Sequence, residues 1–162
     1  MEKSLNMALT VFLSFAVSAG VMAQDYPQRP EASITTGKLC DKPSAVRYPE
    51  KIAYCERDVT YQTKEILMKE YDQKFNYHIQ TLPRADIKID HLIPLCAGGS
   101  NDISNLWPQH KSVYAITDPL EPVICAKMAA GRLKQKEAVS LVIEAKMNLD
   151  RTPKILQYVN EL

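Results

Sequence analysis

Residues 87–108 read IKIDHLIPLCAGGSNDISNLWP, and this stretch decides the fold prediction. It opens with an alternating apolar and polar run, residues 87–89, which is typical of a short β-strand. The run ends at Asp90 and His91, and Pro94 stops the strand shortly afterwards because proline has no backbone N–H to donate. An acid and an imidazole are therefore placed side by side at a strand end.

A loop and a second strand follow. Residues 97–102 form a glycine-turn loop, in which Gly98 and Gly99 permit backbone angles that other residues avoid. A second apolar run, Leu106-Trp107, begins directly after Asn105. The stretch thus predicts two short strands joined by a tight excursion that gathers a carboxylate, an imidazole and a carboxamide. Trp107 is expected to pack in the core.

The string DHLIPLCAGGSNDISNLWPQ, from Asp90 to Gln109, resembles the signature of HNH endonucleases of the ββα-metal (His-Me finger) fold. The string also resembles the branch of that family found in small exported bacterial proteins. The resemblance implies an α+β fold, in which a ββα-metal motif is embedded in a mostly helical single domain stapled by disulfides. It also implies a metal-dependent endonuclease that hydrolyses phosphodiester bonds of nucleic acid, with DNA expected first and RNA open.

The chemistry of phosphodiester hydrolysis suggests a role for each motif residue. His91 is the candidate base, because imidazole titrates near neutrality and can accept a proton from water. Asp90 is the candidate metal ligand, since a hard cation such as Mg²⁺ prefers carboxylate oxygen. The alternative is a purely structural role, in which Asp90 pairs with Lys88 or caps the loop. In the resembled family the asparagine at the position of Asn105 holds the catalytic histidine in position; a turn role is the alternative.

The third metal ligand departs from the family pattern. The expected helical position is Tyr114, and a protonated phenol is a poor ligand. His110 is the nearest substitute and Asp118 the next, although helix capping already explains Asp118. The expected cofactor is a divalent ion, Mg²⁺ first, with Zn²⁺ or Mn²⁺ as alternatives because an imidazole ligand suits transition metals.

The chain begins with a segment typical of a signal peptide, residues 1–23, which has Lys3, an apolar core and a small-x-small end at Ala23. Its apolar core is shorter than the roughly 20 residues that span a bilayer. A periplasmic or secreted location without membrane attachment is therefore expected. Removing the segment removes Glu2 and Lys3 together, so the formal net charge stays at +1.

The remaining chain is expected to hold an extended proline-containing lead-in, residues 24–58, and the nuclease domain, residues 59–162, with its ββα core at about 86–131. Helices are predicted over 60–75, with Thr60 as N-cap and Ile66, Leu67 and Tyr71 inward, and over 118–130, which would supply the helix of the ββα unit. Another is predicted over 135–148, and one more helical turn is expected in the tail after Pro153.

Four cysteines in an exported chain predict two disulfides, and three pairings are open. We favour Cys40–Cys55 and Cys96–Cys125, because the second pair would tie the motif loop to the following helix. Lysines and arginines flank the motif, and Lys111 and Arg84 are the candidate phosphate contacts. Nothing resembles a base-reading helix, so weak sequence preference and salt-sensitive binding are expected.

Two alternatives stay open. The chain could be an exported, disulfide-stapled binding protein that kept the scaffold and lost the metal site, or a module structured by zinc on cysteines. A monomer is expected. An inhibitor protein is a possible partner that the sequence does not reveal.

Overall fold

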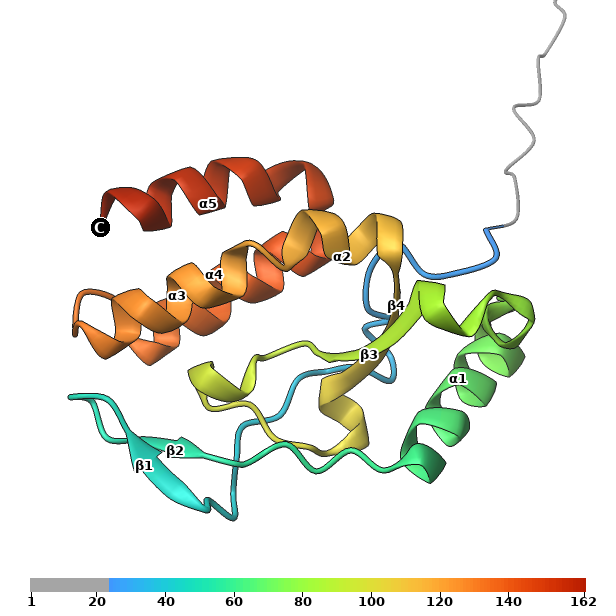
Figure 1. The fold of residues 1–162 in the computed structure, drawn as a ribbon, viewed down its shortest axis with the longest axis horizontal. Coiled ribbons are helices and arrows are strands. Elements are labelled where there is room, and N and C mark those ends of the chain that lie inside the picture. Colours follow the sequence, from blue (N-terminus) through green and yellow to red (C-terminus); the bar gives the residue numbers. More distant parts are fainter. Residues whose placement is uncertain (1–23) are drawn as a thin grey trace, which may run out of the picture.

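The computed structural model describes residues 24–162; the predicted signal peptide lies outside the described residues. The described chain is a mixed α+β structure, mostly helical, with two small antiparallel hairpins (Figure 1). The strands are β1 (Ala45–Arg47), β2 (Ile52–Tyr54), β3 (Ile87–His91) and β4 (Leu106–His110). The helices are α1 (Tyr61–Phe75), α2 (Lys111–Thr117), α3 (Leu120–Ala129), α4 (Gln135–Met147) and α5 (Thr152–Glu161).

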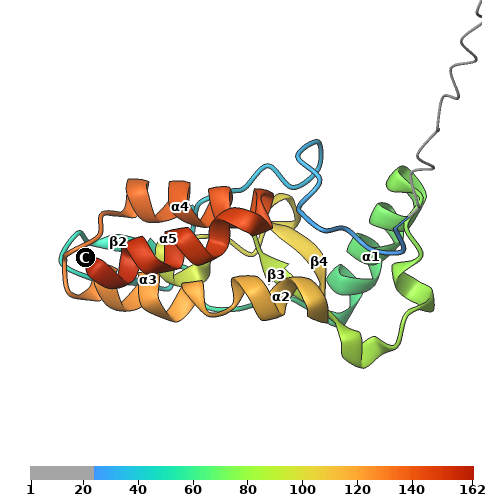
Figure 2. The ribbon, with the colours of Figure 1, turned by 90° about the horizontal axis from the view of Figure 1, so that it is seen from above.

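The β3–β4 hairpin is the centre of the arrangement, and its register pairs Ile87 with His110 and His91 with Leu106. In Figures 1 and 2 it lies between α1 on one side and the layer of α3, α4 and α5 on the other. Helix α2 follows β4 without a gap, so the order strand, strand, helix is continuous.

One core lies within the helical layer. Ile124 and Met128 of α3, Val142 of α4, and Ile155 and Val159 of α5 are all buried in one cluster. Burying such a side chain contributes about 1.5 to 3 kcal/mol each. This packing explains why the tail forms a ten-residue helix, Thr152–Glu161, rather than the single turn predicted after Pro153. The proline sits at the start of α5, where its missing N–H costs nothing.

The second core joins α1 to the β3–β4 hairpin. Leu67 and Tyr71 of α1 are buried as predicted, together with Trp107 of β4. Ile66 is 59% exposed, so its predicted inward position is wrong. Met68 is buried on the inward face of α1 instead. The N-cap prediction is confirmed, because the Thr60 hydroxyl accepts a hydrogen bond from Thr63 N at 3.1 Å.

The helix that completes the strand–strand–helix unit is α2, whereas the sequence predicted one beginning at Asp118. The reason is an unusual cap: His110 Nδ1 accepts a hydrogen bond from Ser112 N at 3.2 Å. Histidine is not among the residues that ordinarily mark a helix start, so the sequence carried no signal for it. Asp118 closes α2 at its C-terminal end, and α3 then runs from Leu120.

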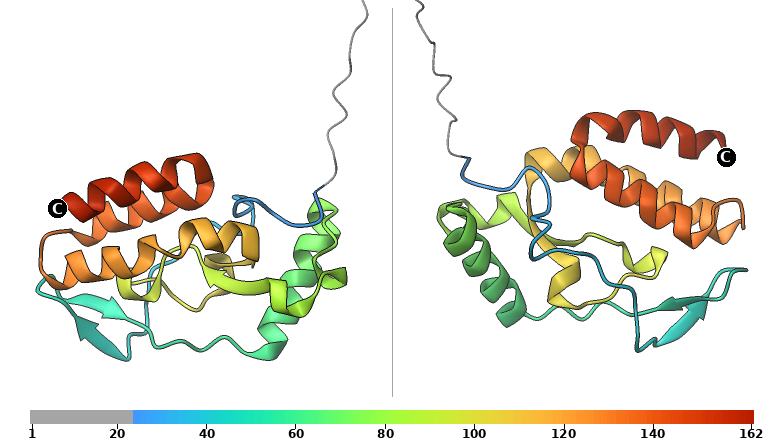
Figure 3. Two further views of the ribbon diagram at one scale, coloured as in Figure 1. Left: turned by 45° about the horizontal axis from the view of Figure 1, so that its top comes forward. Right: turned by 180° about the vertical axis from the view of Figure 1, so that it is seen from behind.

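Residues 24–58 are packed onto the rest of the protein (Figure 3). The Thr35 hydroxyl donates to Leu106 O at 2.9 Å and bonds to the Tyr71 hydroxyl at 2.7 Å. Leu39 forms a β-bridge with Gly99 in the motif loop. The segment also carries the small β1–β2 hairpin, so the predicted lead-in contributes contacts to the motif itself.

Both predicted disulfides are present, Cys40–Cys55 and Cys96–Cys125. The second joins the motif loop to α3, as expected. Among residues 24–162, no helix is long and apolar enough to cross a bilayer. The two disulfides are consistent with export to an oxidising compartment.

Candidate functional site

Asn105 fixes the loop that joins the two central strands. Its side chain is fully buried and its Oδ1 accepts a hydrogen bond from Ile93 N at 2.9 Å. Its Nδ2 donates to Ile93 O at 3.0 Å and to Ser100 O at 2.9 Å. Asn105 therefore clamps the loop backbone on both sides and does not bond to the His91 ring.

The two glycines of the loop are required for different reasons. Gly98 has φ 86°, the left-handed region that glycine adopts most easily. At Gly99 the constraint is space, because a Cβ there would overlap the carbonyl group of Ile93. The sequence-based expectation of unusual backbone angles holds for Gly98, whereas a close backbone approach explains Gly99.

His91 ends β3 and is 3% exposed. Arg57 Nη1 lies 3.2 Å from His91 Nδ1, and Asn101 Oδ1 lies 3.0 Å from His91 Nε2. A guanidinium can only donate, so Nδ1 must be the acceptor and the ring proton must sit on Nε2, where it is donated to Asn101. Arg57 is itself held by donating Nη2–H to Ile89 O at 2.9 Å.

The protonation state of His91 follows from this surrounding. Burial lowers its pKa to about 4, the Asn101 contact opposes that shift, and the Arg57 charge adds to it. The imidazole is therefore neutral at pH 7. A neutral imidazole is the form that can accept a proton.

A polar hollow of about 370 Å³ opens on the outer side of Arg57 and Asn101. Lys42 and Ser44 line it together with Glu56 and Asp58. Asn101 is fixed in the wall by donating Nδ2–H to Glu56 O at 2.7 Å. His91 thus lies behind the two residues that separate it from the hollow.

Asp90 has different partners from its neighbour, as expected for successive residues of a strand. Lys146, near the end of α4, donates from Nζ to Asp90 Oδ2 at 2.6 Å and to His91 O at 2.5 Å. Burial would raise the pKa of Asp90, but the nearby ammonium groups of Lys146 and Lys88 hold it below its usual value. Lys146 itself is 4% exposed, so this is a buried ion pair.

Further charges surround this pair. Lys88 Nζ lies 3.8 Å from Asp90 Oδ1, the pairing that the sequence left as an alternative, and 2.5 Å from Asp118 Oδ1. Burial raises the pKa of Glu121, and the ammonium of Lys146 opposes that rise. Three carboxyl groups and two ammonium groups therefore lie on this side of the hairpin.

The other predicted site residues lie at the opposite end of the hairpin from His91. His110 pairs with Ile87, and its ring stacks on Tyr26 with centroids 3.9 Å apart. Ile87, the partner of His110, lies three residues before Asp90, which corresponds to about 10 Å along an antiparallel strand, so His110 is not placed with Asp90. Lys111 Nζ pairs with Asp86 Oδ2 at 2.9 Å at this same end.

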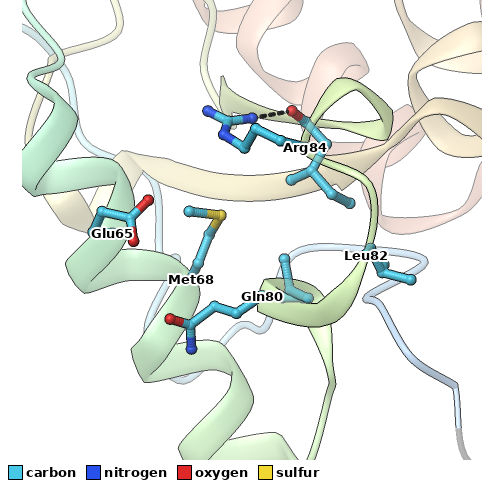
Figure 4. A pocket seen from close by; sticks show the side chains of 7 residues that line it. Glu65, Met68, Gln80, Leu82 and Arg84 are labelled. Atoms are coloured by element: carbon cyan, nitrogen blue, oxygen red, sulfur yellow. Dashed lines mark hydrogen bonds between the residues drawn. The ribbon is translucent and has the colours of Figure 1, made fainter.

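Arg84 also lies at that end, in a separate pocket of about 160 Å³ between α1 and the start of β3. Arg84 Nη1 donates to the backbone carbonyl of Ile87 at 2.5 Å, and the dashed line from the Arg84 guanidinium in Figure 4 marks this hydrogen bond. Glu65 and Met68 line the same pocket from α1. Arg84 and Lys111 are therefore not gathered around His91.

The residues predicted to hold a metal do not form a ligand set in this arrangement. The Asp90 carboxylate is already paired with Lys146, and His110 is at the far end of the strands. Among residues 24–162, one cluster of cysteine and acidic side chains lies close enough together to share an ion, and it consists of Cys96, Glu121 and Cys125. Its two cysteines are joined in a disulfide, which leaves no thiolate to bind an ion.

Sequence reasoning missed the three residues whose side chains contact Asp90 and His91: Arg57, Asn101 and Lys146. Asn101 stands inside the motif loop, but many loop asparagines serve only as turn residues. Arg57 and Lys146 come from outside the motif, 34 residues before His91 and 56 residues after Asp90. Only the tertiary contacts identify them, because neither belongs to a recognisable spacing.

Comparison with family models, with curated proteins and with solved structures finds no match to this chain.

Proposed function

We propose that this protein is an exported endonuclease of the HNH kind that hydrolyses phosphodiester bonds of nucleic acid with weak sequence preference. The observation that carries the proposal is a neutral, buried histidine in contact with Arg57 and Asn101, two residues that line an open polar hollow. The continuous order β3, β4, α2 supports it, because the resembled ββα-metal motif has the same order. The disulfides agree with export.

In the proposed reaction, the anionic phosphate enters the hollow and pairs with Arg57, drawing the guanidinium away from His91 Nδ1. The freed lone pair accepts a proton from water as the water oxygen attacks phosphorus. The bond from phosphorus to the leaving sugar oxygen breaks, and that oxygen takes a proton from solvent. Asn101 keeps the ring oriented by accepting from Nε2–H.

The test is cleavage of supercoiled plasmid, single-stranded DNA and RNA by the full exported chain, with Mg²⁺ or Mn²⁺ and with EDTA. His91→Ala is expected to lose about 100-fold or more of the activity, the usual contribution of a positioned base. His78→Ala is the matched control, since His78 is half-exposed and bonds to Asp25. Equal activity of wild type and His91→Ala would refute the mechanism.

A second candidate function is binding of anionic polymers without cleavage. It is favoured by two contacts that already occupy the groups expected to act in catalysis: Arg57 lies on His91 Nδ1, and Lys146 is paired with the Asp90 carboxylate. This candidate predicts that a labelled oligonucleotide binds, that its affinity falls with added salt and with Arg57→Ala, and that the oligonucleotide stays intact under every metal condition.

A further inference from the structure

The positive charge beside Asp90 is supplied by a side chain of the protein, the ammonium group of Lys146. Lys146 Nζ lies 2.6 Å from Asp90 Oδ2 and 2.5 Å from His91 O, and the lysine side chain is 5% exposed. One ammonium thus joins the carboxylate of the motif acid to the backbone of the motif histidine. These are oxygen atoms of the kind that a hard divalent cation binds.

The surroundings of the ammonium are mixed, with the oxygen atoms of Glu121 and Thr117 beside the apolar side chains of Leu120 and Val142. A cavity of about 10 Å³, room for about one water molecule, lies beside Lys146 and is lined by Glu121 and Thr117. With Lys146 and Lys88 present, two positive charges face the carboxyl groups of Asp90, Asp118 and Glu121. Without the Lys146 side chain the same place would hold an excess of negative charge that matches a divalent ion.

We infer that the Lys146 ammonium is a built-in cation that takes the place of a divalent metal ion at Asp90. It reaches the strand end from α4, whereas the helix after β4 offers Tyr114 where the resemblance expects a ligand. The inference rests on the proposed function for its catalytic meaning, since it concerns the cation of the same site. The inference is tested by metal binding and by thermal stability, whereas the proposed function is tested by cleavage of nucleic acid. Either one can therefore fail while the other holds.

The experiment adds Mn²⁺ to the oxidised, full exported chain and follows melting temperature and electron paramagnetic resonance. Wild type is expected to show no change. Lys146→Ala is expected to melt at a lower temperature than wild type in EDTA, because buried Asp90 then keeps only the more distant ammonium of Lys88, 3.8 Å away. Mn²⁺ at about 100-fold above its Kd should raise that melting temperature by roughly 5 to 10 °C, with one ion bound per chain.

Two variants separate a metal site from general loosening. Lys88→Ala removes an ammonium near Asp90 but leaves Lys146 in place, so Mn²⁺ should not affect it. The double variant Asp90→Asn with Lys146→Met removes both charges and should be indifferent to Mn²⁺. If Lys146→Ala does not fold in EDTA, refolding with and without Mn²⁺ makes the same comparison.

Two results would overturn the inference. One is a wild-type protein that binds Mn²⁺ and loses the ion on Asp90→Asn, because a metal would then displace Lys146. The other is a Lys146→Ala variant that gains no stabilisation from Mn²⁺ over Lys88→Ala, or that stays unfolded with and without the ion.

Discussion

His91 is held without charge between a guanidinium and a carboxamide, and that state affects stability as well as chemistry. Its pKa is about 4 in the folded chain, against an ordinary value of 6.5. As pH falls below 6.5, the unfolded chain therefore takes up the proton first. The stability that neutral His91 supports is complete above about pH 6.5 and is lost as pH falls toward 4.

We predict that acidification from pH 6.5 to 4 lowers the free energy of unfolding by up to about 3 kcal/mol through His91 alone. Urea unfolding of wild type and of His91→Gln, measured across this range, isolates that contribution, since other titrating groups cancel in the difference. A His91→Gln chain with an unchanged slope would show that the imidazole is not held neutral.

At the scale of elements, the loop between β3 and β4 depends on a single side chain. Asn105 satisfies three backbone groups of Ile93 and Ser100 from a fully buried position. Buried backbone groups that lose their partners cost about 1 to 3 kcal/mol each, so the asparagine outweighs any one apolar contact in the loop. The carboxamide is needed because it both donates and accepts.

Asn105→Ala is accordingly expected to lower the free energy of unfolding by about 3 kcal/mol or more, measured by urea denaturation at pH 7. Amide hydrogen exchange should show the loss first in residues 92–104. Asn160→Ala is a suitable control, because Asn160 is exposed and its side chain donates a hydrogen bond to Leu156 O within the same helix. Losses of similar size in both variants would argue against a special role for Asn105.

At the scale of the whole molecule, two cores meet at the β3–β4 hairpin and the disulfides connect the outlying parts to it. Cys40–Cys55 closes a loop of 15 residues in the N-terminal segment, and Cys96–Cys125 closes one of 29 residues between the motif loop and α3. The longer loop removes more entropy from the unfolded chain.

Replacing Cys96 and Cys125 by serine should therefore cost about 3 to 4 kcal/mol, and replacing Cys40 and Cys55 about 3 kcal/mol. Urea unfolding of the two double variants, compared with wild type, measures both losses. Because Cys96 sits in the motif loop, its variant should also expose the loop amides to faster hydrogen exchange. A larger loss from the Cys40 and Cys55 pair would contradict the loop-length argument.

Local pattern determined much of this protein. The two central strands, the Thr60 cap and the start of α4 follow from alternation, capping chemistry and helical spacing, which act between residues near one another in the chain. The presence of two disulfides followed from the cysteine count and the expected export, and the favoured one of the three possible pairings is the one observed. The grouping of Asp90, His91 and Asn105 in one hairpin was likewise visible in the sequence, although their partners were not.

Only the tertiary structure decided which residues contact Asp90 and His91. Arg57 reaches His91 and Lys146 reaches Asp90 across 34 and 56 residues of chain, contacts that no local spacing encodes. The same holds for the length of α5, which is set by the apolar face that it buries on α3 and α4, and for His110, drawn to Tyr26 and the cap of α2. Burial and charge pairing act through space, so they were fixed only once the helices had packed around the hairpin.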